Sequence, residues 1–296
     1  MSGPDSTLPQ SVAGLTGILR EGGYLADRGL STALFVALSL GRPILLEGEV
    51  GVGKTEIAKA LAQVLDRRLI RLQCYEGIDT HQALYEWDYA RQMLAIRALS
   101  EQQLADDGSV DALFGPRFLL ERPLLDAVRT GAGAVLLVDE VDRADDEFEA
   151  FLLELLSDFQ ITIPEIGTIV AEQPPLVVLT SNRTRELHDA LKRRCLYHWV
   201  GFPSPERELE IVQVRAPEVS RSLAEAAVAA VHRLREMDLA KPPGVAETID
   251  WVRTLEVVGA ERLEPEVAAD TLGAVIKDRD DLDQVRDDLG WVTSGA

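Results

Sequence analysis

Cysteine is scarce in this chain of 296 residues, which contains only Cys74 and Cys195. Two cysteines cannot form the disulfide framework of a small secreted protein. The chain also lacks a long apolar run, because its most apolar stretch, residues 33–40, is far too short to cross a bilayer. No basic segment followed by an apolar core opens the chain. These absences predict a cytoplasmic location and no stable membrane insertion.

Basic residues are in deficit as well. The chain has 30 Lys and Arg against 50 Asp and Glu, so its formal charge is −20. Such a charge repels nucleic acid unless a local basic patch overrides it. The densest basic clusters, Arg67-Arg68 with Arg71 and residues 192–194, are too short to form a convincing groove. We therefore expect a protein partner and no nucleic acid.

One motif stands out among the residues that are present. Residues 48–55 fit the pattern G-x-x-x-x-G-K-[ST] at every fixed position, between an apolar run at 43–47 that predicts a strand and a segment with helical periodicity. A glycine-rich turn before a helix is the alternative interpretation, and the flanking elements disfavour it. In a phosphate loop the backbone N–H groups and the helix N-terminus hold the anion, the lysine reaches the outer phosphates and the Thr55 hydroxyl binds Mg²⁺. The predicted ATP-binding residues are Gly48, Glu49, Val50, Gly51, Val52, Gly53, Lys54 and Thr55.

Strand and helix patterns alternate through the first two-thirds of the chain. Apolar runs predict further strands, a hairpin is expected where residues 160–163 meet 164–167, and helical patterns cover other segments. The expected strands are 69–72, 134–138 and 176–179; the expected helices are 25–40, 83–99 and one starting near Thr184, with a polar break at 106–108. This order predicts an α/β sandwich around a parallel sheet. We expect a loose N-terminus at 1–10, a core at 11–202 and a small all-helical lid at 203–296.

Two acids follow the apolar run at 134–138. Asp139 can hold Mg²⁺, directly or through water, and Glu140 can orient the water that attacks the γ-phosphate. Isolated acid pairs are more often helix caps or solvated charges, but here they follow a buried strand downstream of a phosphate loop. By contrast, residues 145–147 are expected to begin a helix and complement its dipole.

Asn182 follows the strand expected at 176–179, where its carboxamide could bind the γ-phosphate or the lytic water; turn chemistry is the alternative. The phosphate loop, the Asp-Glu strand and the strand ending at Asn, in this order, resemble the AAA+ ATPases. The resemblance implies that Asn182 senses the nucleotide. It also implies that Arg194, or Arg193 in reserve, stabilises charge on the nucleotide of a neighbouring subunit. A basic helix end that complements the helix dipole is the alternative for these arginines.

Within AAA+ proteins the chain resembles the MoxR family. The resemblance is carried by the Leu45–Thr55 segment, the block Asp139-Glu-Val-Asp-Arg-Ala144 where the family favours Asp-Glu-Ile-Asn-Arg-Ala, and the Phe159–Ile163 hairpin strand. Residues 75–89 further resemble a subgroup encoded beside carbon monoxide dehydrogenase genes. One departure is that Ala246 stands where the family's lid commonly carries a sensor arginine. Arg253 could substitute for it or be a surface or core-lining arginine.

The resemblance implies a homo-oligomer, a hexamer, that hydrolyses ATP with Mg²⁺ and works as a chaperone. Its expected partners are a von Willebrand factor type A domain protein and a client metalloenzyme, with a molybdenum carbon monoxide dehydrogenase as the first candidate. Three alternatives stay open: a nucleic-acid motor or loader, a nucleotide-dependent binding switch with little turnover, and a small-molecule phosphotransferase. The Asn182 and Arg194 positions disfavour the phosphotransferase, because both suit attack by water.

Overall fold

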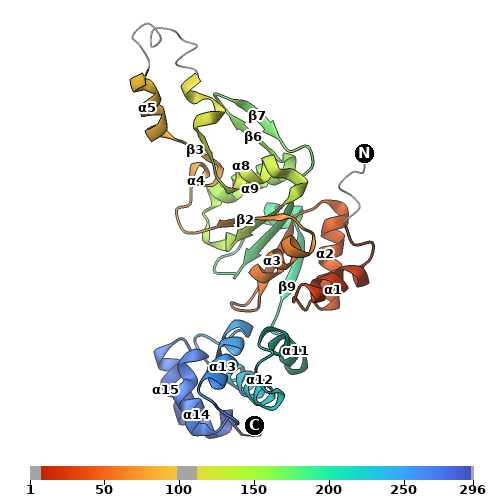
Figure 1. The fold of residues 1–296 in the computed structure, drawn as a ribbon, viewed down its shortest axis with the longest axis vertical. Coiled ribbons are helices and arrows are strands. Elements are labelled where there is room, and N and C mark those ends of the chain that lie inside the picture. Colours follow the sequence, from red (N-terminus) through yellow and green to blue (C-terminus); the bar gives the residue numbers. More distant parts are fainter. Residues whose placement is uncertain (1–7, 99–111, 295–296) are drawn as a thin grey trace. The chain divides into compact units, whose positions relative to one another are not determined.

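The computed structural model describes residues 8–98 and 112–294 (Figure 1). Residues 1–7 of the expected loose N-terminus and the expected break at 106–108 lie outside this part. Within it, every helix is too short or too polar to span a bilayer. The described residues form two compact units. One comprises the described residues up to Ile18, Ala26–Glu47 and those within Ile57–His198, and the other comprises Leu19–Leu25, Gly48–Glu56 and the described residues from Trp199 onward.

A five-stranded sheet organises the first unit. Its order is β2 (Arg68–Gln73), β5 (Ala134–Asp139), β8 (Leu176–Ser181), β1 (Ile44–Gly48) and β9 (Leu196–Val200). Strands β2, β5, β8 and β1 pair in parallel, and every residue of β5 and β8 is buried. Continuous apolar runs are what a strand covered on both faces requires. The predicted strands and the parallel α/β fold are confirmed, whereas β9 is an additional strand that the sequence patterns had not indicated.

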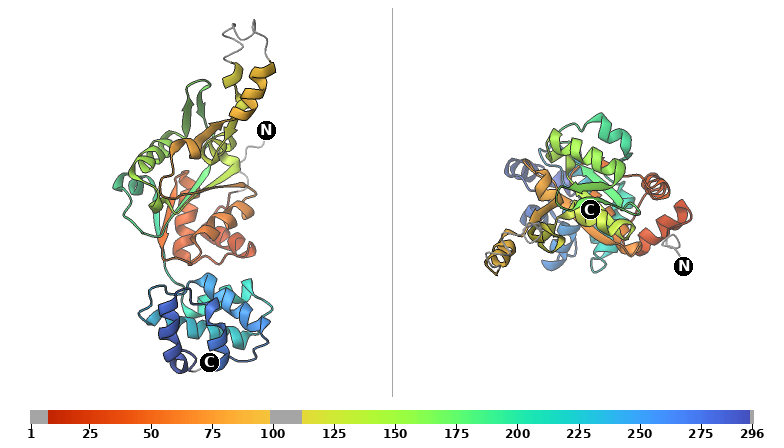
Figure 2. Two further views of the ribbon diagram at one scale, coloured as in Figure 1. Left: turned by 90° about the vertical axis from the view of Figure 1, so that its left-hand side faces the viewer. Right: turned by 90° about the horizontal axis from the view of Figure 1, so that it is seen from above.

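Helices cover both faces of this sheet. Alternate β5 residues Leu136 and Val138 belong to one apolar core with Phe148 and Leu152 of α9 and with Leu191 of α10. Figure 2 shows α9 and α10 on the face opposite the N-terminal helices. The bounds of these helices are α1 (Val12–Glu21), α2 (Arg28–Leu40), α3 (Lys54–Val64), α9 (Asp146–Asp158) and α10 (Asp189–Arg194).

Local capping fixes where two of these helices begin. The Asp27 carboxylate accepts the Leu30 N–H at 2.7 Å, so α2 begins at Arg28, three residues later than predicted. The Asp145 carboxylate accepts the Phe148 N–H at 2.9 Å and caps α9, which confirms the helix start expected at residues 145–147. The acids that follow Asp145 lie in the first turn, where they complement the helix dipole.

The helix predicted at residues 83–99 is wrong in its first half. The chain instead forms α4 (Thr80–Leu84), β3 (Tyr85–Trp87) and α5 (Tyr89–Ala98), and β3 pairs antiparallel with β4 (Leu119–Glu121). Trp87 is buried and meets the Phe114 ring edge-on, with centroids 5.5 Å apart. The strand is therefore stabilised by a partner more than thirty residues downstream, which local periodicity cannot reveal. Between β4 and β5 the chain forms α8 (Pro123–Thr130).

The hairpin predicted around residues 160–167 is confirmed. Strand β6 (Gln160–Ile163) pairs antiparallel with β7 (Gly167–Val170), with Ile163 opposite Gly167. Ile161 and Ile163 point into the core, while the β7 residues are half-buried or exposed. Gly167 has a φ of +101°, a conformation that side chains disfavour, and it starts the returning strand.

After Val200, the last residue of β9, the described residues of the second unit form helices and no strand. Its helices are α11 (Pro205–Arg215), α12 (Arg221–Glu236), α13 (Val245–Val257), α14 (Pro265–Thr271), α15 (Arg279–Asp287) and α16 (Leu289–Val292). Beside their apolar core, the fully buried Glu208 carboxylate accepts bonds from Arg235, His232 and the Thr248 hydroxyl. A buried charge persists only when it is paired in this way, so the cluster ties α11, α12 and α13 together.

Candidate functional site

The phosphate loop turns on two glycines and encloses its lysine. Gly51 and Gly53 have φ values of +78° and +93°, which L side chains rarely adopt. A Cβ at Gly48 would lie 2.0 Å from the Val200 carbonyl oxygen, so that position also needs glycine. Lys54 begins α3, and its buried Nζ donates to the carbonyl oxygens of Gly48 at 2.7 Å and Glu49 at 2.6 Å. An ammonium group is thus held inside a loop that precedes a helix N-terminus, which suits phosphate.

The loop also contacts helix α13 of its own unit. The Gly51 carbonyl oxygen accepts the Val245 N–H at 3.0 Å, where α13 begins. Ala246, the residue at the sensor-arginine position, also directs its N–H at this oxygen, at 3.4 Å. Arg253 is exposed: it lies 3.5 Å from the Glu218 carboxylate and donates to the Arg215 carbonyl oxygen at 2.5 Å. These are the contacts of a surface arginine.

Asp139 ends β5 with a buried carboxylate. Its Oδ1 accepts the Thr180 hydroxyl at 2.6 Å, and its Oδ2 accepts Arg71 Nε at 3.0 Å and Nη2 at 2.6 Å. Thr180 stands on the neighbouring β8 and Arg71 on β2, so strands on both sides of β5 orient this carboxylate. Among the described residues, no group of three or more His, Cys, Asp or Glu side chains could hold a metal by itself. A single carboxylate nevertheless suits Mg²⁺, which takes its remaining oxygens largely from phosphates and water.

Glu140 adopts a left-handed backbone, with φ at 55° and ψ at 51°. This conformation is uncommon outside glycine, and such strain concentrates at functional sites. The Glu140 N–H donates to the Thr180 hydroxyl oxygen at 2.9 Å, which holds the turn. Its Oε2 accepts Gln73 Nε2 and Arg143 Nη1, both at 3.1 Å. The carboxylate is therefore half-exposed but tethered on two sides.

Asn182 directly follows β8, and Asp142 holds the backbone around it. The buried Asp142 carboxylate accepts the Asn182 N–H at 3.2 Å, the Thr184 N–H at 2.8 Å and the Thr184 hydroxyl at 2.7 Å. The helix predicted to start near Thr184 begins only at Asp189, because residues 182–188 are held by such side-chain bonds instead. The acid block after β5 thus positions the loop that carries Asn182.

Arg193 and Arg194 end α10 and are both exposed. The Arg194 guanidinium contacts the Ser157 hydroxyl of α9. Arg42 binds the end of the same helix: its Nη2 donates to the carbonyl oxygens of Arg193 and Arg194, both at 2.9 Å. These carbonyls are left without helical partners at a C-terminus, and a guanidinium satisfies them well. Arg42 therefore fixes the backbone from which both arginines project.

Sequence reasoning missed the side chains that hold the two acids. Arg71 and Gln73 alternate with buried residues on β2, a pattern that also fits a solvated strand face, and Thr180 lies inside a buried strand. Their one signal is position, since all lie at or near the carboxyl ends of parallel strands, where ligands bind in α/β sheets. Asp142 had appeared only as a point of family resemblance.

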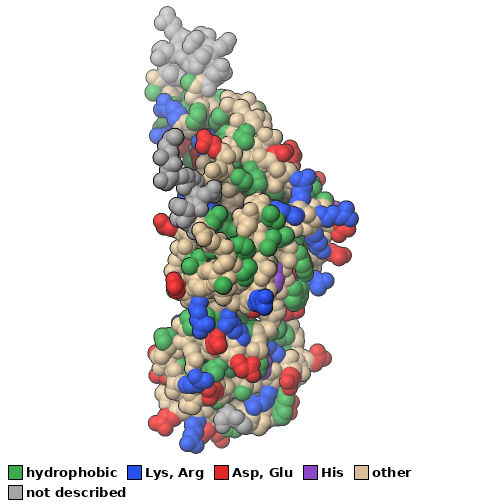
Figure 3. All heavy atoms as spheres, turned by 90° about the vertical axis from the view of Figure 1, so that its right-hand side faces the viewer, with side chains coloured by type: hydrophobic (Ala, Val, Ile, Leu, Met, Phe, Trp, Pro, Cys, Tyr) green, Lys and Arg blue, Asp and Glu red, His purple; other side chains and the backbone are tan. Residues whose placement is uncertain are grey.

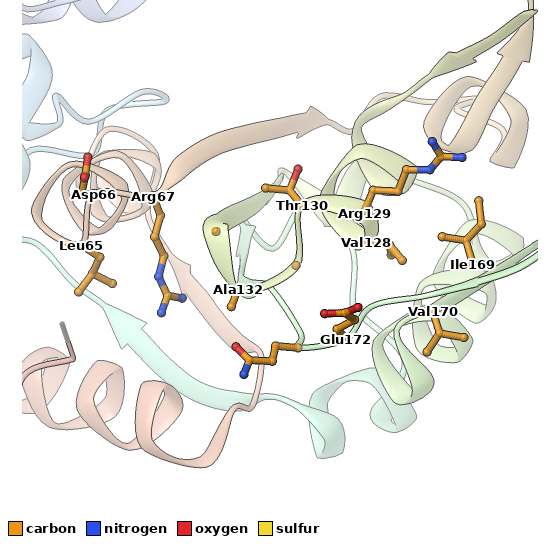
Figure 4. Close-up of a pocket in the computed structure, with 13 residues that line it drawn as sticks. Leu65, Asp66, Arg67, Val128, Arg129, Thr130, Ala132, Ile169, Val170 and Glu172 are labelled. Carbon is orange, nitrogen blue, oxygen red and sulfur yellow. The ribbon is translucent and has the colours of Figure 1, made fainter. Parts of the chain in front are cut away.

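A separate hollow of about 860 Å³ lies at the opposite ends of β2 and β5 (Figure 4). Its lining includes Arg67 before β2, the Gly131–Gly133 turn before β5, and Ile169 and Glu172. Burial lowers the pKa of the Arg67 guanidinium. Because this hollow lies at the amino ends of the strands, it is distinct from the acids at their carboxyl ends.

Comparison with known proteins decides the family. The profile of the AAA domain (dynein-related subfamily) matches residues 43–195, just over half of the chain. The chain belongs to this AAA family. It is therefore an AAA+ ATPase domain, whose cofactors are ATP and Mg²⁺.

Relatives share the domain rather than the whole protein. The chain is 34% identical over 147 residues to chaperone protein ClpB 1 of Nostoc, covering 48% of this chain and 14% of that protein. It is 31% identical over 152 residues to ClpB of Mycoplasmoides gallisepticum, covering 48% and 17%. An uncharacterised protein of Staphylococcus saprophyticus is 26% identical over 172 residues, with 56% and 57% covered.

Solved structures agree on the fold. A mutant RuvB of Thermotoga maritima has a TM-score of 0.50 and 20% identity, covering 94% of this chain and 75% of that one. Another RuvB mutant has the same TM-score and 23% identity, covering 93% and 75%. Likeness at this level of identity establishes the α/β architecture and nothing about substrate.

Proposed function

We propose that this ATPase is a MoxR-type chaperone that assembles into a ring and remodels, or helps to mature, a client metalloenzyme. The observation that carries the proposal is the Asp139–Ala144 block, which provides the two acids, positions Asn182 through Asp142 and leads into α9 and the β6–β7 hairpin. AAA+ proteins commonly form hexamers. The matched ClpB chaperones are several times longer than this chain, so their names do not give its activity. The proposed activity rests on the Asp139–Ala144 block instead.

Different residues of the chain carry out the separate steps of ATP hydrolysis. Gly48–Thr55 binds the triphosphate, with Lys54 transferring its bonds from loop carbonyls to phosphate oxygens. Thr55 and Asp139 hold Mg²⁺, which neutralises phosphate charge when bound. Glu140 orients the attacking water and accepts its proton, and Asn182 donates its carboxamide N–H groups to the γ-phosphate or that water.

Arg194 acts on the nucleotide of a neighbouring copy, with Arg193 in reserve. An arginine is suited to this role because its planar, permanently charged guanidinium stabilises charge that spreads over the phosphoryl oxygens. Arg194 is exposed on a helix end that Arg42 fixes, which supports a role outside its own chain. A single chain then has an incomplete site, and turnover requires assembly.

Hydrolysis moves the lid against the core, and the ring transmits that motion to the client through the β6–β7 hairpin and loops. A von Willebrand factor type A domain protein is the expected partner, and a molybdenum carbon monoxide dehydrogenase is the first client to test. The test is the metal content of that enzyme, purified from cells with and without this protein. A reduced metal content in the deletion strain supports the client, and an unchanged content rejects it.

A nucleic-acid motor is the second candidate, and charge disfavours it. The face drawn in Figure 3 mixes acidic, basic and apolar side chains without a broad basic surface, in keeping with the net charge of −20. A binding titration with single- and double-stranded DNA at low salt tests this candidate. Binding that weakens steeply with added salt would revive it.

The ring is tested by ATP turnover per chain as a function of protein concentration. A steep rise to a plateau supports assembly of a shared site. A finite rate that is independent of concentration would mean that one chain holds a complete site. No turnover at any concentration would favour a nucleotide-dependent switch.

A further inference from the structure

Arg71 and Asp139 form an ion pair in which one side chain is half-exposed and the other is buried. Arg71 stands on the outermost strand, β2, and Gln73, two residues on, is paired in register with Asp139. The Asp139 side chain is 3% exposed and fixed from both sides, whereas the Arg71 side chain is 50% exposed. The carboxylate therefore stays in place while the guanidinium has solvent into which it can move.

Both Arg71 bonds fall on one oxygen. Nε and Nη2 converge on Asp139 Oδ2 at 3.0 and 2.6 Å, while the Thr180 hydroxyl binds Oδ1. A metal held by this carboxylate, directly or through water, would lie close to the Arg71 guanidinium. Because the two cations repel each other there, Arg71 and Mg²⁺ compete for Asp139.

Arg71 is also linked to Glu140 through Gln73. Arg71 Nη2 also donates to Gln73 Oε1, and Gln73 Nε2 donates to Glu140 Oε2 at 3.1 Å. The Gln73 carboxamide has a third partner, because its Nε2 also lies 3.4 Å from the Cys74 carbonyl oxygen, and displacing Arg71 removes one of the three. A change at Asp139 therefore reaches Glu140 through two side chains of the same strand.

We propose that Arg71 is a built-in counter-ion of Asp139 that Mg²⁺ displaces, and that this displacement releases Gln73 and so adjusts Glu140. The inference rests on the proposed roles of Asp139 and Glu140. Arg71 is thereby a positioning residue that sets how much Mg²⁺ the nucleotide-bound site requires. It keeps a buried carboxylate neutralised before the metal arrives, at the cost of weaker metal binding.

The test is a Mg²⁺ titration of nucleotide binding, with no turnover involved. A fluorescent, non-hydrolysable ATP analogue is held at fixed concentration, and the Mg²⁺ concentration at half-maximal signal is compared among variants. The matched control is Arg68→Gln, because Arg68 lies on the same strand and pairs with Asp126 at 2.7 Å, away from the acids.

Arg71→Gln should lower the half-maximal Mg²⁺ concentration about two- to fivefold, the size expected for losing a half-exposed competing ion pair. Arg68→Gln should leave it unchanged, and Arg71→Lys should restore most of the wild-type value. A half-maximal concentration that is unchanged or raised in Arg71→Gln overturns the inference. So does a loss of analogue affinity that Mg²⁺ does not influence, because Arg71 would then bind the nucleotide itself.

The variant Asp139→Asn shows whether a negative result means that Arg71 is not a counter-ion or that Asp139 does not bind Mg²⁺ at all. If that variant raises the half-maximal Mg²⁺ concentration while Arg71→Gln does not lower it, the counter-ion role alone is wrong. If Asp139→Asn has no effect either, Asp139 is not the metal ligand, and both the proposed site and the inference are rejected.

Discussion

Asp142→Asn should destabilise the core and slow ATP turnover, although it replaces Asp with the residue that the MoxR pattern favours. The Asp142 carboxylate accepts three hydrogen bonds with two oxygens, from the backbone N–H groups of Asn182 and Thr184 and from the Thr184 hydroxyl. Asparagine keeps one acceptor and replaces the other with an NH₂ group. The Asn182 N–H can keep its bond and the Thr184 hydroxyl can turn to accept, but the Thr184 N–H then faces a donor.

The magnitude follows from that single lost bond. Hydrogen bonds to a charged group contribute about 1.5–3 kcal/mol, and Asp142 is only 2% exposed, so water cannot substitute easily. We expect the free energy of unfolding to fall by about 2 kcal/mol, which lowers the Tm of a unit this size by about 4–8 °C. Turnover should fall as well, because the loop that carries Asn182 loses an anchor.

Calorimetry and urea unfolding measure the stability, and a coupled assay measures turnover. The matched control is Asp145→Asn, the same change of charge at an exposed helix cap where asparagine serves as well as aspartate. Equal unfolding free energies for the two variants, within about 0.5 kcal/mol, would refute the argument that Asp142 holds this loop.

Three further predictions concern other parts of the molecule. Burial raises the thiol pKa of both Cys74 and Cys195 to about 12, so a thiol reagent at pH 8 should label neither in the native protein and both in denaturant. Burial alone would raise the pKa of Glu208, but its hydrogen bonds and the Arg235 charge lower that pKa overall. The charged Glu208 therefore contributes its full share of the folding stability above the ordinary Glu pKa, and this contribution is lost as the pH falls through the lowered pKa. Glu208→Gln should therefore cost about 3 kcal/mol near neutral pH and less in acid, as measured by urea unfolding at several pH values. Arg42→Ala should reduce turnover of the assembled protein about tenfold by loosening Arg194, with nucleotide affinity unchanged, whereas Arg42→Lys should be intermediate.

The central sheet was predictable because burial on both faces demands uninterrupted apolar runs. Residues 134–138 and 176–179 show such runs, and the structure confirms them as β5 and β8. Strand β9 was missed because its residues alternate between half-buried and exposed, including Tyr197 and Trp199, so no such run marks it. Strand β3 was missed because it depends on pairing with β4, and non-local pairing leaves little trace in a short segment.

The site was predictable where chemistry fixes the spacing of residues. The phosphate loop and the acid pair are contiguous motifs, so they were named without knowledge of the fold. The residues that hold them come from separate strands: Arg71 and Gln73 reach the acids only because β2 lies beside β5. The catalytic roles of these residues remain predictions, as does the action of Arg194 on the nucleotide of a neighbouring subunit.

The most direct test of the shared site mixes two inactive variants. In a ring, a Glu140→Gln subunit can lend its Arg194 to an Arg194→Ala subunit, which still carries Glu140. Each variant alone should be nearly inactive, and an equal mixture assembled at random should recover about a quarter of wild-type ATP turnover, because one site in four combines both groups. No recovery in the mixture, or full activity of Arg194→Ala alone, would contradict the account.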